Sequence, residues 1–407
     1  MPSKGELRLQ RLLAEHERWR SRESLNLLAS ENLSSPSVQR YLSSDMGRRY
    51  TLELDQVLHG EKVDNGYAGT RYLDEVEGMA RSLAAKLLHG KRASVKPLSG
   101  HVAALCVLAP LLPRGARYLA VFPEQGGYDG YAPAYIPSVL GYTARELPVH
   151  GPLHEVDVEE VTTKIRREKP EAVILGQSYF VLPYPVRPIA DAVHEHGGKL
   201  LYDASHVMGL VMGGEFQDPL GEGADVVYGS THKSFFGPQG GIIAARDIEL
   251  LDRIEAYMTW RILDNAHWNR IAALTQALLE MERYGRAYAS TVVVNARALA
   301  SELEAQGIPV LGADLGYTRS HQVFLDGATL KARHGLAPPG LARRLERQDI
   351  LIDLVGRVGT AEATRLGVRK TDMPDIARWI HSAGILGKPV KAQVNAFRRR
   401  FKRLRFA

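Results

Sequence analysis

A repeated alternation of short apolar runs and helical segments, between about residues 90 and 245, constrains the fold of this chain most strongly. The runs 172–176, 198–203 and 224–228 have the length and composition of buried strands. Strands that alternate with helices predict a mostly parallel sheet with helices on both faces. Ligands of such sheets bind beyond the carboxyl ends of the strands. Polar residues that follow these runs are therefore the first candidates for a functional site.

Lys233 lies in a glycine-rich turn that directly follows the run 224–228. Ser230, Thr231 and His232 precede it, and glycines and a proline follow it. A solvated surface lysine is one interpretation of such a turn. The other is covalent capture of a carbonyl, for which the amine must be neutral, so burial or nearby cations must lower its pKa.

Asp203 and His206 follow the preceding apolar run, one strand ahead of the lysine. Pyridoxal phosphate (PLP) needs a carboxylate beside its pyridine nitrogen, so that the ring stays protonated and accepts electrons. An aspartate at a strand end fits that need. Lys233 and Asp203 together predict PLP held as a Schiff base on the lysine, with the aspartate at the ring nitrogen.

The segment 93–101 precedes a helical apolar run at 102–112. Backbone N–H groups at the start of a helix attract a phosphate, especially beside serine and glycine. Ser99, Gly100 and His101 are therefore the expected seat of the PLP phosphate, completed by Ser230.

The segments 202–210 (YDASHVMGL) and 230–241 (STHKSFFGPQGG) resemble serine hydroxymethyltransferase, and the resemblance extends over most of the chain. It implies a PLP-dependent transferase of fold type I, an α/β architecture. That fold has a mostly parallel sheet of the seven-stranded type in a large domain, and a smaller C-terminal α/β domain. The expected parts are an N-terminal arm at 1–30, a PLP-binding domain at 31–290, and a small domain at 291–407 with a basic tail.

The resemblance also implies roles for single residues. Ser30 and Arg365 are expected to hold the substrate carboxylate, since a guanidinium matches a carboxylate in two parallel hydrogen bonds. Tyr50 and Tyr67 are expected at the substrate. Tyr50 is also a catalytic candidate for the transfer of the hydroxyl proton, and it is expected to reach the neighbouring subunit. The other residues expected at the cofactor are Ser178, His206 and His232.

The chain departs from the family at the acid used for proton transfer and folate contact. Leu52 stands at its position, and the segment 51–65 is longer than expected. Glu53 is the nearest substitute and is predicted to be catalytic. Glu61 and Asp64 are alternatives, and surface acids on a longer loop are the competing interpretation.

Three further departures concern the ring, folate and the phosphate. Gln125 stands where the family has a histidine stacked on PLP, with Tyr128 three residues on, and either is able to cover the ring. The segment 352–359 replaces an asparagine-rich folate segment. Asn265 or His267 is expected to substitute for a missing phosphate loop of the partner subunit.

Composition excludes several other classes. The 407 residues are 45% hydrophobic and 24% charged, with no apolar run of membrane-spanning length and no apolar N-terminal signal. The single cysteine, Cys106, excludes an internal disulfide and fits a cytoplasmic location. The net charge of +6 lies in the tail 398–407, which is expected to be a solvated end or a subunit contact. The sequence predicts no metal, nucleic-acid or membrane partner. It predicts a homodimer with shared active sites.

These features predict a PLP enzyme that makes or breaks the Cα–Cβ bond of a small β-hydroxy amino acid, with an aldehyde as the second partner. Because of Leu52 and the segment 352–359, a folate-independent aldolase or transaldolase is favoured. The alternatives are a folate-dependent serine or α-methylserine hydroxymethyltransferase, an amino-acid racemase that breaks Cα–H, and a non-catalytic relative that binds through its tail.

Overall fold

The computed structural model describes residues 1–407, apart from the side chain of Asp55. The chain forms two compact units, one of residues 32–289 and one that joins residues 1–31 to residues 290–407. Residues 1–30, expected as an N-terminal arm, thus belong to the same unit as the C-terminal region.

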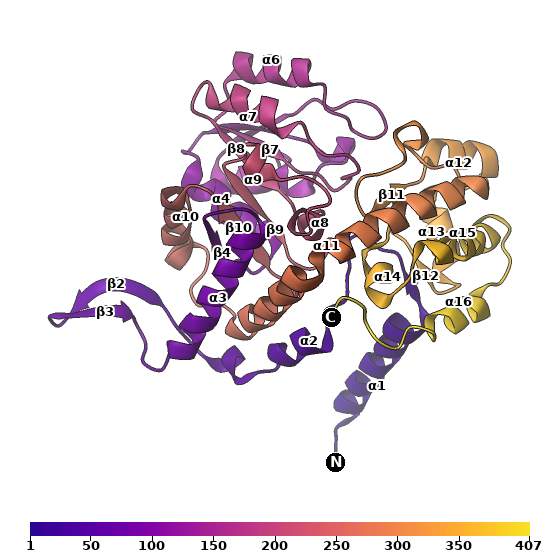
Figure 1. The fold of residues 1–407 in the computed structure, drawn as a ribbon, viewed down its shortest axis with the longest axis horizontal. Coiled ribbons are helices and arrows are strands. Elements are labelled where there is room, and N and C mark those ends of the chain that lie inside the picture. Colours follow the sequence, from indigo (N-terminus) through magenta and orange to yellow (C-terminus); the bar gives the residue numbers. More distant parts are fainter. The chain divides into compact units, whose positions relative to one another are not determined.

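A seven-stranded sheet forms the centre of the unit 32–289 (Figure 1). Six strands run in one direction and β10 alone runs against them, because β10 pairs antiparallel with both of its neighbours. This confirms the predicted α/β fold with a mostly parallel sheet. In spatial order the strands are β4 (Arg92–Ser94), β10 (Gly241–Ala245), β9 (Val226–Ser230), β8 (Lys199–Asp203), β7 (Ala172–Leu175), β5 (Arg117–Ala120) and β6 (Thr143–Glu146).

Helices cover both faces of this sheet (Figure 1). On one face α4 (Gly100–Leu111) and α10 (Ile248–Arg261) pack in a core with alternate strand residues such as Leu201 and Tyr228. The intervening residues point to the other face, where α7 (Val186–His194) packs on β8 and α6 (Val158–Glu168) packs on α7. The predicted apolar runs all became buried strands or the buried helix α4.

The remaining elements of this unit surround the sheet. The segment 51–65 is an antiparallel hairpin of β2 (Glu53–Leu58) and β3 (Glu61–Asn65), which projects from the start of α3 (Figure 1). Cys106 is buried in α4, and burial raises the pKa of its thiol to about 12, as expected for a core residue. The other helices are α2 (Pro36–Leu42), α3 (Arg71–Leu87), α5 (Ile136–Leu140), α8 (Met208–Met212), α9 (Pro219–Glu222) and the first part of α11 (Trp268–Ala305).

The second unit has its own apolar core, to which Leu25, Leu341 and Phe397 belong. Two strand pairs organise it: β1 (Leu25–Asn26) with β12 (Ile350–Leu351), and β11 (Gln322–Phe324) with β13 (Arg357–Gly359). Its helices are α1 (Lys4–Arg18), α12 (Gly327–His334), α13 (Pro338–Glu346), α14 (Ala361–Leu366), α15 (Met373–Ile380) and α16 (Lys391–Arg398). Across the described residues, no helix has the length and apolar character needed to span a bilayer.

Candidate active site

Loops beyond the strand ends of the unit 32–289 enclose a cavity of about 250 Å³. The strands β4, β7, β8 and β9 all point their carboxyl ends toward it, which is where a mostly parallel sheet binds its ligands. The cavity is lined by Ser99, Gly100, His101, Tyr128, Gln177, Ser178, Asp203, Ser205, His206, Ser230, His232 and Lys233.

Lys233 contributes the only lysine amine among the residues that line this cavity. Its Nζ lies 3.4 Å from Nε2 of His206, which is itself buried. Asn32 stabilises the main chain of the turn that carries Lys233. Its Nδ2 donates to the carbonyls of Lys233 (2.8 Å) and Ser234 (3.2 Å). The amine is thus placed on a fixed turn rather than on a mobile loop, as a residue that captures a carbonyl requires.

Asp203 ends β8 and is buried beside the cavity. Its Oδ2 accepts a hydrogen bond from the Tyr131 hydroxyl (2.6 Å), and its Oδ1 accepts one from the Ser205 N–H (2.9 Å). Gly176, at the end of β7, permits this approach, because a Cβ there would lie 2.6 Å from Cβ of Asp203. The carboxylate is therefore buried and oriented.

Hydroxyl groups and backbone N–H groups gather at the start of α4. The hydroxyl of Ser99 caps the helix by accepting from the Val102 N–H (3.1 Å), and Gly100 is the first helical residue. A Cβ on Gly100 would lie 3.0 Å from the Ser230 nitrogen, so a larger residue would crowd the seat. A helix start with serine hydroxyls around it attracts a phosphate.

Of the two residues expected to cover a bound ring, only Tyr128 lines this cavity. Its hydroxyl lies 2.9 Å from Nδ1 of His101. Gln125 lies in a different place: it lines a second cavity of about 650 Å³, together with Glu146, His150 and other charged residues.

PLP fits the residues present in the cavity. An amine, a buried carboxylate and a helix start with hydroxyl groups lie around one space, which matches the aldehyde, the ring nitrogen and the phosphate of that cofactor. Oε1 of Gln177 is buried at the same cavity and accepts no hydrogen bond from the described residues. A buried acceptor of this kind calls for a ligand or water as its donor.

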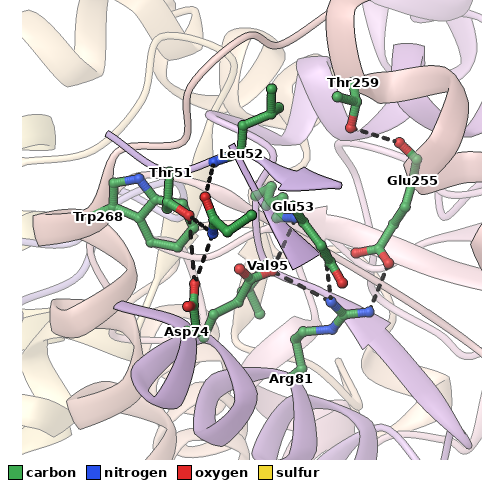
Figure 2. A network of polar contacts seen from close by, with 12 residues as sticks. Thr51, Leu52, Glu53, Asp74, Arg81, Val95, Glu255, Thr259 and Trp268 are labelled. Atoms are coloured by element: carbon green, nitrogen blue, oxygen red, sulfur yellow. Dashed lines mark hydrogen bonds and ion pairs between the residues drawn. The ribbon is translucent and has the colours of Figure 1, made fainter. Parts of the chain in front are cut away.

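The hairpin segment lies outside this cavity. Glu53 points toward Arg81, which also pairs with Glu255 (Figure 2). Its carboxylate lies 3.4 Å from Nζ of Lys96 and 3.7 Å from the Arg81 guanidinium, and it lines a charged cavity of about 550 Å³ that also includes Asp64. Leu52, at the position of the expected acid, is buried, and its N–H donates to Oδ1 of Asn65.

Tyr50 and Tyr67 lie together on the surface of their unit, with ring centroids 4.8 Å apart. The Tyr50 hydroxyl donates to Asp264, and this bond raises the pKa of Tyr50 to about 12. Asn265, expected to substitute for a phosphate loop of the partner subunit, contacts the segment that carries Tyr50: its Nδ2 donates to the Arg49 carbonyl (3.1 Å).

The two residues expected to hold a substrate carboxylate belong to the other unit. Ser30 is half-buried in the turn after β1, next to Ala29, whose carbonyl accepts from Nε2 of His321 (2.9 Å). Arg365 is fully buried in α14. Its Nη1 donates to the carbonyls of Arg405 (3.1 Å) and Phe406, in the last residues of the chain.

Sequence reasoning missed three contributors to this geometry. Tyr131 and Asn32 touch Asp203 and the lysine turn from distant positions in the chain, and no spacing rule connects them. The tail carbonyls that meet Arg365 were also missed, because main-chain contacts leave no signature in residue type. Tyr128 was an open alternative to Gln125, and the aromatic ring was the available signal.

Comparison with known proteins gives a consistent result. The family model described as serine hydroxymethyltransferase matches residues 8–333. Serine hydroxymethyltransferase of Aeropyrum pernix is 36% identical, over 98% of this chain and 93% of that protein. The enzyme of the same name from Methanopyrus kandleri is 37% identical, over 97% and 94%.

A solved structure is similar over nearly the whole chain. It is the crystal structure of L-threonine transaldolase from Pseudomonas fluorescens in the internal aldimine state. The similarity has a TM-score of 0.88 at 27% sequence identity, and it covers 98% of this chain and 92% of the other.

Proposed function

Because the chain belongs to the serine hydroxymethyltransferase family, we propose that it makes or breaks the Cα–Cβ bond of a small β-hydroxy amino acid without folate. The family and the structural similarity identify a PLP-dependent enzyme of the transferase or aldolase type. The substrate and the independence from folate are the proposed part.

One observation carries the folate-independent proposal. Leu52 fills the position of the family acid with a buried apolar side chain, and the carboxylate of the adjacent Glu53 pairs with Lys96 and Arg81. The structural similarity to an L-threonine transaldolase supports the same reaction type. An aldol-type exchange on glycine needs an aldehyde partner, not a folate.

The cofactor cavity supplies the groups for such a reaction. PLP, when bound, withdraws electrons from the Cα bond that stands perpendicular to its ring. We propose that Lys233 holds the cofactor and yields it to the amino acid, and that Asp203 faces the ring nitrogen. Ser99, Gly100, His101 and Ser230 hold the phosphate in this proposal.

Other proposed roles concern the ring and the substrate. His206, His232 and Ser178 line the cavity and are proposed at the ring and its substituents, with Tyr128 in place of Gln125 as the ring cover. Arg365 and Ser30 are proposed to hold the substrate carboxylate.

We further propose a homodimer in which Tyr50, Tyr67 and Glu53 serve the partner's site, since none of them lines the cofactor cavity of its own unit. Glu53 would then take the proton of the β-hydroxyl group, since the Tyr50 phenol, with its raised pKa, keeps its own proton. The partner would pack on an apolar cavity of about 580 Å³, which is lined in part by Tyr72, Met79 and Leu279.

Incubation of the holoenzyme with L-threonine or L-allo-threonine, without folate, tests the proposal. Glycine and acetaldehyde are the expected products, and addition of a second aldehyde should yield a new β-hydroxy amino acid. Serine turnover that requires folate would overturn the proposal in favour of a folate-dependent hydroxymethyltransferase. Interconversion of D- and L-alanine without release of an aldehyde would replace it with racemisation.

A further inference from the structure

Two buried tyrosines, Tyr131 and Tyr228, form a hydrogen-bonded pair that reaches Asp203 without lining the cavity. The Tyr131 hydroxyl lies 2.6 Å from Oδ2 of Asp203 and 2.7 Å from the hydroxyl of Tyr228. Both tyrosines are fully buried in the core beneath the sheet, and neither lines the cofactor cavity. Their hydroxyl groups are therefore placed to act on the carboxylate and not on a substrate.

The hydrogen-bond directions follow from counting protons. Each hydroxyl donates one proton. A carboxylate only accepts, so Tyr131 donates to Asp203 and its oxygen then accepts from Tyr228. The result is a one-way chain of two donors, Tyr228 to Tyr131 to Asp203.

The charge of Asp203 has no cationic hydrogen-bond partner among the described residues. Across the described residues, Asp203 pairs with no lysine, arginine or histidine; its partners are Tyr131 and the Ser205 N–H. Neutral donors stabilise an anion without cancelling its charge, and a donor that is itself hydrogen-bonded is the stronger donor. The open side of the carboxylate faces the cavity, where a protonated ring nitrogen would supply the missing cation.

The tyrosines act as donors over the whole working pH range. Burial raises the pKa of both Tyr131 and Tyr228 well above the ordinary value, and the negative charge of Asp203 adds to the effect. Neither group becomes a phenolate that would repel Asp203.

We propose that Tyr131, supported by Tyr228, is a positioning residue that orients Asp203 and stabilises its negative charge for the cofactor ring nitrogen. The proposal rests on the role proposed above for Asp203. Tyr131 donates to Oδ2 and the Ser205 N–H donates to Oδ1. The two hydrogen bonds together fix the plane of the carboxylate. Loss of the Tyr131 hydroxyl would free the carboxylate to rotate. It would also remove a hydrogen bond that stabilises the negative charge of Asp203.

Tyr131→Phe in the full-length protein tests the proposal, with two readouts. The dissociation constant of PLP, measured by absorbance titration of the apoprotein, is expected to rise about 10-fold, as for a lost hydrogen bond to a charged group. The kcat of the holoenzyme at saturating PLP should fall about 10-fold or more, while the KM for the amino acid stays within about threefold, because the substrate carboxylate is held elsewhere.

Two further variants show whether the chain of donors matters. Tyr228→Phe should shift both values in the same direction but by about threefold, since it removes only the second donor. Tyr142→Phe is the matched control: its hydroxyl lies 3.2 Å and 3.0 Å from the carbonyl oxygens of Leu108 and Leu112 at the end of α4 and makes no contact with Asp203. It should leave the PLP affinity and kcat unchanged.

Asp203→Asn separates the two levels of the proposal. If Asp203→Asn lowers PLP affinity and kcat strongly while Tyr131→Phe behaves as the unmodified protein, the tyrosine role is wrong and the role of Asp203 stands. If Asp203→Asn also has no effect, the proposed function of the cavity fails with it. An equal loss of PLP affinity in Tyr131→Phe and Tyr142→Phe would overturn the positioning role in favour of general loss of packing.

Discussion

The cofactor cavity and the surroundings of Arg365 are built in different ways. In the cavity, Asp203 accepts a hydrogen bond from the N–H of Ser205, two residues later in the chain. Ser99 accepts one from the N–H of Val102, three residues later. Arg365 is instead held by carbonyls 40 and 41 residues away, at the end of the chain. Short-range hydrogen bonds thus hold part of the first site, beside the long-range ones from Tyr131 and Asn32, whereas Nη1 of Arg365 meets carbonyls at the end of the chain.

Removal of the Lys233 amine is expected to have the largest effect on the cofactor cavity. Lys233→Ala should abolish the absorbance of covalently bound PLP and lower the rate of retro-aldol cleavage at least about 10³-fold, since no other amine among the described residues lines the cavity. Borohydride reduction followed by mass analysis of the peptides checks the attachment.

Lys86→Ala is the matched control for that variant. Lys86 is exposed and pairs with Glu282 on the surface, so its removal should leave colour and activity in place. A yellow Lys233→Ala protein that borohydride still reduces would move the cofactor to another amine.

The tail offers the corresponding test in the other unit. Both N–H groups of Arg365 Nη1 point to the carbonyls of Arg405 and Phe406, which leaves the guanidinium without rotational freedom. Truncation after Phe401 should raise the KM for the amino acid about 3- to 10-fold, because two hydrogen bonds to a charged group are lost. Arg365→Lys, which loses the fork itself, should raise it about 10- to 100-fold.

The contacts of the tail are main-chain contacts, and this provides the control. Replacing Lys402 and Arg403 by alanine in the full-length chain removes two exposed charges but no carbonyl that Arg365 meets. KM should therefore stay unchanged in that variant. If it rises as much as in the truncation, the tail acts through its charge and the comparison drawn above is wrong.

The difference between local and long-range contacts also explains which parts of the fold and of the site were predicted from the sequence. Strand periodicity predicted the sheet, and residues at strand ends such as Asp203, Ser178 and Lys233 were placed together correctly because parallel strands end at one edge. Tyr131, Asn32 and the tail carbonyls were missed, since each reaches its target through packing between segments far apart in the chain. Gln125 was placed by alignment alone, and the turn at Gly126 and Gly127 directs it to a separate cavity.

Two buried carboxylates, one in each region, give the finest test. Asp203 accepts hydrogen bonds from Tyr131 and Ser205, whereas Glu362, three residues before Arg365 in α14, accepts one from Nδ2 of Asn26 at 2.8 Å. Burial raises the pKa of Glu362 from 4.5 to about 7. Between these two pH values the folded protein binds more protons than the unfolded chain, so the free energy of unfolding falls as pH rises through that window.

Glu362→Gln should remove this pH dependence, since an amide keeps the acceptor for Asn26 but does not ionise. The variant is expected to gain stability over the unmodified protein between pH 4.5 and 7, to a plateau of about 2–3 kcal/mol above pH 7. Urea unfolding at pH 5 and pH 8 measures the gain, and Glu346→Gln, an exposed acid of α13, is the control. An equal gain at both pH values would show that Glu362 ionises normally.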